Sequence, residues 1–172
     1  MKFFTRLLLT VFFISLYFNA NAEINVRYLN LDYILQNSIV GKNISKKALE
    51  NRKSKINEFK KIEKDLSNKK NDILSKKNIL DKKQFDNEVN KHQENVKKYH
   101  TKKNKELNEL NKKNAEMVNK FMKKIDVVLK EYVKDNSIDL VYKQEAILVS
   151  SAKFDITKII LDEVNNKIKK ID

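Results

Sequence analysis

Residues 55–66 read KINEFKKIEKDL, and this spacing of apolar among charged side chains runs through a stretch from Lys42 to Asn136 without Gly or Pro. The apolar positions of its first half fall at steps of three, three, four and seven: Ile56, Phe59, Ile62, Leu66 and Ile73. Such a thin stripe is typical of the a/d seam of a coiled coil, because a globular core helix needs a broader apolar face. The stretch therefore predicts long, paired helices.

The stripe loses its phase at residues 76–81 and then resumes. Its second half follows steps of four, three, four and three at first: Phe85, Val89, His92, Val96, Tyr99, then Leu107, Leu110, Met117, Phe121, Ile125, Val128 and Tyr132. Asp81, with Gln84 three residues later, resembles a capping box that opens a helix. Since two helices joined by a short connection pack antiparallel, we expect a helical hairpin with its tip between Lys76 and Asp81.

Short strand-like segments lie on either side of this arm. Ile24, Val26 and Tyr28 predict a strand of period two, and residues 30–36 predict a turn into a short helix. Gly41, the only glycine, is expected to supply a backbone conformation that other residues avoid, where the head gives way to the arm.

Beyond the arm the pattern changes again. Residues 139–143 and 146–150 predict a β-hairpin around a turn at Gln144 and Glu145, and Asp155 is the expected N-cap of a final helix. The predicted fold class is α+β, mostly α: a helical hairpin arm at 42–136, inserted into a small head formed by 23–41 and 137–172.

Three short strands and two small helices bury little apolar surface alone. We therefore expect the heads of several chains to associate and share a sheet or barrel. The residues predicted to form the sheet core or the subunit interface are Ile24, Val26, Val141, Ile147 and Val149.

The first 22 residues have the features of a secretory signal peptide. Lys2 and Arg6 precede an apolar run at 7–18, which is shorter than the roughly 20 residues that span a bilayer. Small residues then form an A-x-A site, so cleavage after Ala22 is expected, with an uncleaved anchor as the alternative. Because the chain has no cysteine, an exported protein of this kind fits the bacterial periplasm.

Positive charge is concentrated in the arm, which contains 28 Lys or Arg residues and only 15 Asp or Glu residues. Lysine pairs spread around both helices, either as a solvated face or as a field that steers acidic, partly unfolded proteins or contacts anionic lipid or lipopolysaccharide. The candidate steering residues are Lys97, Lys98, Lys102, Lys103, Lys112 and Lys113.

Apolar residues also cluster near the expected tip. They could contact an unfolded client or could simply close the end of the hairpin: Ile73, Leu74, Ile79, Leu80 and Phe85.

Catalytic chemistry is not expected. The lack of cysteine excludes thiol chemistry, and a chain with one glycine cannot build a glycine-rich phosphate loop, which argues against ATP-driven action. His92 and His100 lie about 80° apart around a helix without a carboxylate cluster, so no metal site is expected. We therefore predict no cofactor, no metal and no enzyme activity, and export argues against nucleic acid as a specific partner.

Both ends of the chain resemble the Skp/OmpH family of periplasmic chaperones. The resemblance rests on residues 24–30, 34–35 and 41–42 at the front, and on residues 138–142, 146–149 and 155–157 at the back. It implies a homotrimer with a β-barrel body and tentacle-like arms, acting as an ATP-independent holdase for unfolded outer-membrane β-barrel proteins. The alternatives are an exported structural or adhesive coiled-coil protein of the envelope, or a binder of polyanions such as lipopolysaccharide or nucleic acid.

Overall fold

The computed structural model describes residues 24–171. The signal peptide expected at 1–22, with its cleavage after Ala22, lies outside the described residues.

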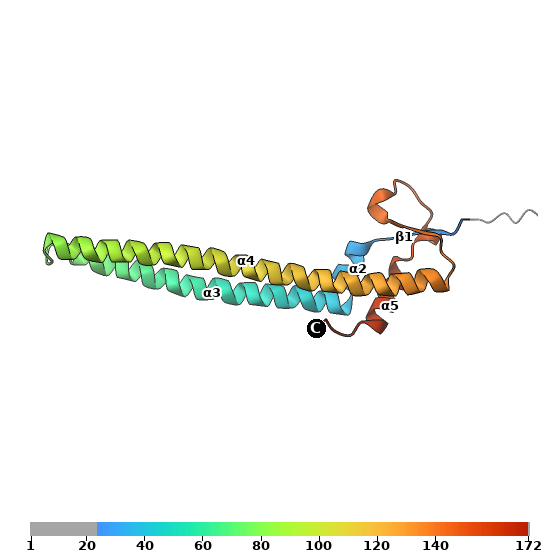
Figure 1. The fold of residues 1–172 in the computed structure, drawn as a ribbon, viewed down its shortest axis with the longest axis horizontal. Coiled ribbons are helices and arrows are strands. Elements are labelled where there is room, and N and C mark those ends of the chain that lie inside the picture. The colour runs from blue at the N-terminus through green and yellow to red at the C-terminus, as the bar shows by residue number, and fades with distance from the viewer. Residues whose placement is uncertain (1–23, 172) are drawn as a thin grey trace, which may run out of the picture.

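Two long antiparallel helices make up the arm, and the remaining elements gather at one end of it (Figure 1). The element order is β1 (Val26–Leu29), α2 (Leu31–Asn37), α3 (Ile39–Ser75), α4 (Lys82–Asp135), β2 (Leu140–Lys143), the 3-10 turns Gln144–Ala146 and Ala152–Phe154, and α5 (Thr157–Lys167). The mostly helical fold and the helical hairpin are thus confirmed.

The two arm helices differ in length. With 37 and 54 residues, α3 and α4 are about 55 Å and about 80 Å long at 1.5 Å per residue. The extra length of α4 lies in the head, where its last turns run beside α5 (Figure 1). Helix α4 is therefore both half of the arm and a central element of the head.

The tip of the hairpin lies where the phase of the stripe is lost. Helix α3 ends at Ser75 and α4 begins at Lys82. The backbone N–H of Gln84 donates to Asp81 Oδ1 over 2.8 Å, which makes Asp81 the N-cap of α4. The predicted tip and its capping residue are both confirmed.

The head holds one small parallel sheet. Strands β1 and β2 pair in the register Val26↔Leu140 through Leu29↔Lys143. The predicted β-hairpin is wrong for this chain: residues 144–146 form a 3-10 turn, and 147–150 form no strand. The physical reason is that β2 finds its partner in β1, while the following segment leaves the sheet and meets no strand that could satisfy its backbone groups.

Gly41 has a different role from the one predicted. It lies inside α3 with no positive φ angle, so it supplies no unusual backbone conformation. A Cβ atom at this position would lie 1.7 Å from the carbonyl oxygen of Leu35 at the end of α2. Glycine is required because two helices approach closely here.

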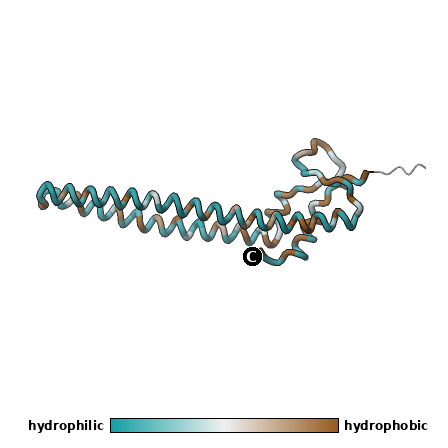
Figure 2. Tube along the Cα trace, viewed as in Figure 1, coloured by the Kyte–Doolittle hydropathy of each residue, from teal (hydrophilic) through white to brown (hydrophobic). Residues whose placement is uncertain are grey.

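The head is better packed than its strands alone would suggest, because α2, α3, α4 and α5 all contribute to one core. Figure 2 shows hydrophilic residues along most of the arm and more frequent hydrophobic segments in the head. The buried core consists of Leu29, Ile34, Val40, Ile44, Phe121, Ile125, Val128, Ile156, Ile160, Val164 and Ile168.

The segment Asp155-Ile156-Thr157 ties α5 to the first strand. Asp155 Oδ1 accepts the N–H of Thr157 at 2.8 Å, but the N-cap of α5 is Ile156, which makes no side-chain capping bond. The predicted N-cap at Asp155 is therefore wrong by one residue, because α5 begins only at Thr157. The N–H of Ile156 donates to the Tyr28 carbonyl at 2.9 Å, and buried Thr157 Oγ1 accepts the N–H of Asn30 at 2.9 Å. Ile156 and Thr157 thus join the front and back parts of the head.

Candidate binding surfaces of the arm and the head

An aromatic and ionic cluster joins the two helices in the middle of the arm. The rings of Phe59 and Tyr99 pack edge to face with their centroids 6.2 Å apart. Glu63 Oε1 accepts the Tyr99 hydroxyl at 2.7 Å and Lys103 Nζ at 2.6 Å. Because Phe59 and Tyr99 are both buried, this cluster sets the register between α3 and α4.

The ionisation of this cluster follows from its contacts. The hydrogen bond from Lys103, followed by that from Tyr99, lowers the pKa of Glu63 below its usual value of 4.5. Burial, followed by the hydrogen bond to Glu63, raises the pKa of the Tyr99 hydroxyl. Both shifts favour an ionised Glu63 beside a neutral tyrosine and a charged lysine at neutral pH.

Two further ion pairs cross between the helices. Lys55 Nζ lies 2.9 Å from Glu106 Oε2, and Lys69 Nζ lies 3.9 Å from Glu88 Oε2. The hydrogen bonds to Glu58 and Glu106 raise the pKa of Lys55, and that of Glu106 is lowered mainly by Lys55. Such exposed pairs contribute little stability individually, so they chiefly align the helices.

The apolar residues predicted near the tip divide into two groups. Ile73 is 4% exposed and packs between the helices, where it closes the hairpin end. Leu74 and Ile79 are 51% and 80% exposed, whereas Leu80 and Phe85 are half-buried. The structure thus leaves Leu74 and Ile79 as the members best placed to contact another molecule.

A groove lies along the distal half of the arm. It has a volume of about 770 Å³ and is lined by Lys70, Ile73, Leu74, Val89, His92, Gln93, Val96, Lys97, His100, Thr101 and Asn104. Only Ile73, Leu74 and Lys97 were predicted from the sequence as candidate contact residues, whereas Val89, His92 and Val96 were predicted only as seam positions. The remaining lining residues were missed because most belong to the seam or its flanks, and spacing alone does not show where a seam opens to solvent.

The predicted basic residues lie on α4, four of them within the stretch that lines the groove and Lys112 and Lys113 nearer the head. All except Lys103 are exposed; Lys103 is half-buried because it bonds Glu63 and lies 5.7 Å from the centre of the Phe59 ring. A second hollow of about 480 Å³ is lined by Glu94, Lys97, Lys98, Thr101, Lys102 and Lys105. Three of the predicted lysines therefore line one surface.

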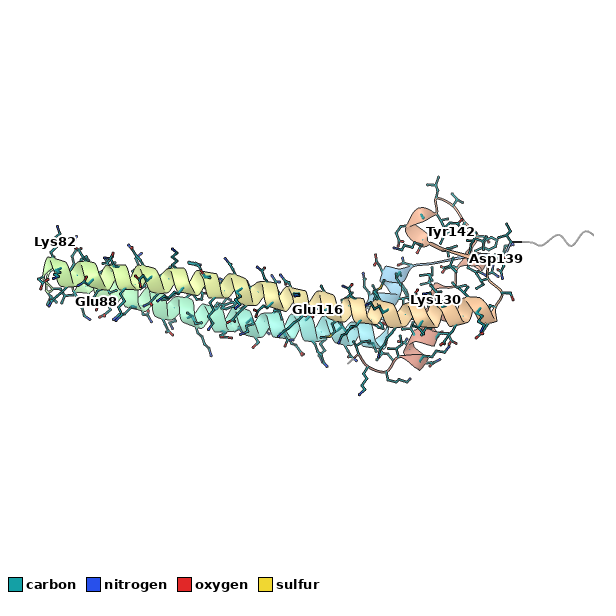
Figure 3. The ribbon with its side chains drawn as sticks, viewed as in Figure 1. Lys82, Glu88, Glu116, Lys130, Asp139 and Tyr142 are labelled. Atoms are coloured by element: carbon teal, nitrogen blue, oxygen red, sulfur yellow. The ribbon has the colours of Figure 1, made fainter. Side chains whose placement is uncertain are left out.

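In the head, the predicted interface residues are unequally covered. Ile24 and Val149 are 65% and 87% exposed, while Val26, Val141 and Ile147 are half-buried. Leu140 and Tyr142 of β2, each 47% exposed, and Leu148, fully exposed, were not predicted. Figure 3 shows Tyr142 and Asp139 together at the end of the molecule opposite Lys82 and Glu88.

The arrangement of a long helical hairpin between β1 and β2 is matched by a known protein family. A family described as outer membrane protein (OmpH-like) matches residues 25–164, which span the front of the head, the whole arm and α5 as far as Val164. The chain belongs to the OmpH-like family. This membership confirms the resemblance drawn from the two ends of the sequence.

A solved structure supports the same fold for this OmpH-like chain. It is the crystal structure of a candidate outer membrane chaperone (OmpH-like) from Caulobacter crescentus, with a TM-score of 0.81 and 14% sequence identity. The match covers 91% of this chain and 94% of the other. At such low identity the likeness concerns the fold alone. A search of curated proteins found no match.

Two further features bear on function. Within residues 24–171, no helix is both long and apolar enough to cross a membrane. The same residues contain no group of three or more His, Asp or Glu side chains placed to hold a metal ion.

Proposed function

We propose that this OmpH-like chain is an ATP-independent holdase that binds unfolded outer-membrane β-barrel proteins in the periplasm and prevents their aggregation. The observation that carries the proposal is the family match over residues 25–164, which covers the head and the arm together. Chaperones of this family act in the periplasm on proteins bound for the outer membrane. The proposal assigns the chain no catalytic step.

The arm has the surface properties that a holdase needs. Its 28 basic and 15 acidic residues give a positive field over both helices, which raises the rate of encounter with acidic chains. Leu74, Ile79 and the groove between the helices offer apolar contact beside this charge. Many weak contacts of both kinds would hold an unfolded chain without fixing its conformation.

We further propose that three heads associate into a β-barrel body from which the arms extend. A two-stranded sheet leaves strand edges open, and isolated two-stranded sheets are marginal in water. Ile24, Leu140, Tyr142, Leu148 and Val149 expose apolar surface around this sheet. Residues 146–150, which form no strand in one chain, could pair once a neighbouring head supplies an edge.

The holdase proposal is tested by diluting a denatured outer-membrane β-barrel protein from urea, with and without an equal amount of this chain, and following light scattering. We expect scattering to be suppressed at low salt, and more weakly at high salt because charge aids capture. Unchanged aggregation at low salt would overturn the proposal. It would favour the alternative of a structural or adhesive coiled coil, which requires no binding of unfolded chains.

The assembly proposal is tested by sedimentation. The wild-type chain is expected to sediment as a trimer. The double variant Leu148→Asp with Val149→Asp is expected to sediment as a monomer. Its helicity should be unchanged, because both side chains are exposed in the single chain. The control is Ile79→Asp, at another largely exposed apolar residue, which lies at the arm tip and should stay trimeric. A monomeric wild type at micromolar concentration would contradict shared heads.

A further inference from the structure

The groove in the distal arm combines an apolar floor with a basic rim. Ile73, Leu74, Val89 and Val96 supply the floor, while Lys70 and Lys97 supply the charge. Its lining contains no Asp or Glu. The volume of about 770 Å³ lies within the range of roughly 300–1,000 Å³ that ligand pockets occupy. An occupant must therefore be largely apolar and compatible with positive charge.

The basic hollow continues directly from the groove, because Lys97 and Thr101 line both. It adds Lys98, Lys102 and Lys105, and Glu94 is its single acidic residue. The two overlap along α4, but the apolar residues Val89 and Val96 come before the lysines of the hollow, which therefore lie on the side nearer the head. The complementary ligand is apolar at one end and acidic at the other.

One residue of the groove lining has a buried nitrogen without a hydrogen-bond partner among residues 24–171. His92 lines the groove, and its Nδ1 is buried and makes no hydrogen bond among residues 24–171. Buried side-chain polar atoms usually have a partner. In a neutral imidazole protonated at Nε2, Nδ1 accepts a hydrogen bond, and an extended polypeptide offers main-chain N–H donors.

We propose that the groove and the basic hollow together dock an extended polypeptide segment in which a short apolar run is followed by acidic side chains. The apolar run lies on Ile73, Leu74, Val89 and Val96, and the acidic side chains lie along Lys97, Lys98 and Lys102. His92 Nδ1 accepts a main-chain N–H of the segment. This inference rests on the proposed holdase function, because it takes unfolded clients to be the source of the segment.

The test uses the intact chain and two labelled peptides of equal length, which share one apolar run. One continues with Asp and Glu, the other with Lys, and fluorescence anisotropy gives the dissociation constant of each. The acidic peptide is expected to bind at least about tenfold more tightly. Equal affinity for the two peptides would overturn the proposal.

Charge reversal locates the site. The double variant Lys70→Glu with Lys97→Glu is expected to raise the dissociation constant of the acidic peptide by about tenfold. The matched control, Lys60→Glu with Lys61→Glu, makes the same change in net charge at exposed lysines of α3 outside both hollows and is expected to change affinity by less than about twofold. Equal losses in the two variants would show diffuse attraction and would overturn a defined site.

His92→Leu separates docking from folding. Removing an unpaired buried nitrogen should raise the melting temperature of the arm. The same change is expected to raise the dissociation constant of the acidic peptide by about threefold, because the acceptor for its main-chain N–H is lost. A more stable arm with unchanged affinity would remove His92 from the proposed site.

The remaining outcomes are also decisive. If a second copy of this chain filled the groove, Lys70→Glu with Lys97→Glu would change the sedimenting mass, and the proposal would fail. Light scattering is measured on the same samples. A wild type that binds the acidic peptide selectively but fails to suppress aggregation would leave the docking site standing and overturn only the holdase function.

Discussion

Gly41 of α3 lies so close to α2 that a Cβ atom would come within 1.7 Å of the Leu35 carbonyl oxygen. The neighbouring Ser38 ends α2 and caps α3, since its Oγ accepts the Gly41 N–H at 3.1 Å. The head and the arm therefore meet at a junction of two helices with no room for a side chain.

Gly41→Ala should destabilise this junction. The added methyl group meets backbone rather than a movable side chain, so α2 must shift, and overpacking typically costs about 1–3 kcal/mol. Thermal unfolding followed by circular dichroism measures the loss. Ser45→Ala, an exposed position one turn further along α3, is the control and is expected to change stability by less than about 0.5 kcal/mol. A Gly41→Ala variant as stable as the wild type would contradict the close approach.

The end of α4 predicts a stabilising change. Ser137 has a φ of 49°, and its N–H and that of Ile138 bond back to the carbonyls of Lys134 and Val133, as in a Schellman motif. A left-handed conformation is costly for a residue with a Cβ, so Ser137→Gly is expected to stabilise the protein by about 0.5–1 kcal/mol. Ser54→Gly, in the exposed interior of α3, should instead destabilise it by about 0.5 kcal/mol.

The hydrogen bond between Thr157 and Asn30 predicts that the protein loses stability when the Thr157 hydroxyl is removed. Thr157→Val keeps the shape of the side chain but leaves the Asn30 N–H without its acceptor in a partly buried site. Leaving such a donor unpaired costs about 1–3 kcal/mol, which chemical denaturation would measure. The same substitution at exposed Thr101 should change stability by less than about 0.5 kcal/mol. Equal effects would show that the hydroxyl of Thr157 carries no structural contact.

Acid should weaken the middle of the arm. Because Lys103 and Tyr99 lower the pKa of Glu63 below 4.5, its stabilising effect is complete above that pH and is lost as the pH falls through the lowered value. We expect the melting temperature of the wild type to exceed that of Glu63→Gln at neutral pH, and the two to converge in acid. Glu116→Gln, at the exposed Glu116 labelled in Figure 3, should show no such convergence. A constant difference across the pH range would contradict an ionised Glu63 in the cluster.

Much of the arm could be predicted from local pattern. The heptad-like spacing from Ile56 to Ile73 and from Phe85 to Tyr99 indicated two paired helices, and Asp81 with Gln84 indicated where the second begins. These predictions succeeded because helix periodicity and capping depend on residues only a few positions apart.

The candidate sites were predicted less well. Lys97, Lys98 and Lys102 were singled out and lie together on one hollow, but Val89, Val96 and His100 were not recognised as lining a groove. Whether a seam residue is covered or open depends on how the facing helix packs, and composition does not contain that information. Ile73 and Leu74, adjacent in sequence, differ from 4% to 51% exposed for this reason.

Local sequence therefore determined the helical hairpin, its tip and its capping residue, since each depends on residues close together in the chain. The concentrated positive charge follows from the numbers of basic and acidic residues in the arm. Tertiary structure decided that β2 pairs with β1 rather than with residues 146–150, and that Gly41 is needed for space rather than for an unusual φ. The strand pairing joins residues more than a hundred positions apart, such as Val26 and Leu140. The place of Gly41 depends on how α2 and α3 pack, and neither relationship leaves a periodic signal in the chain.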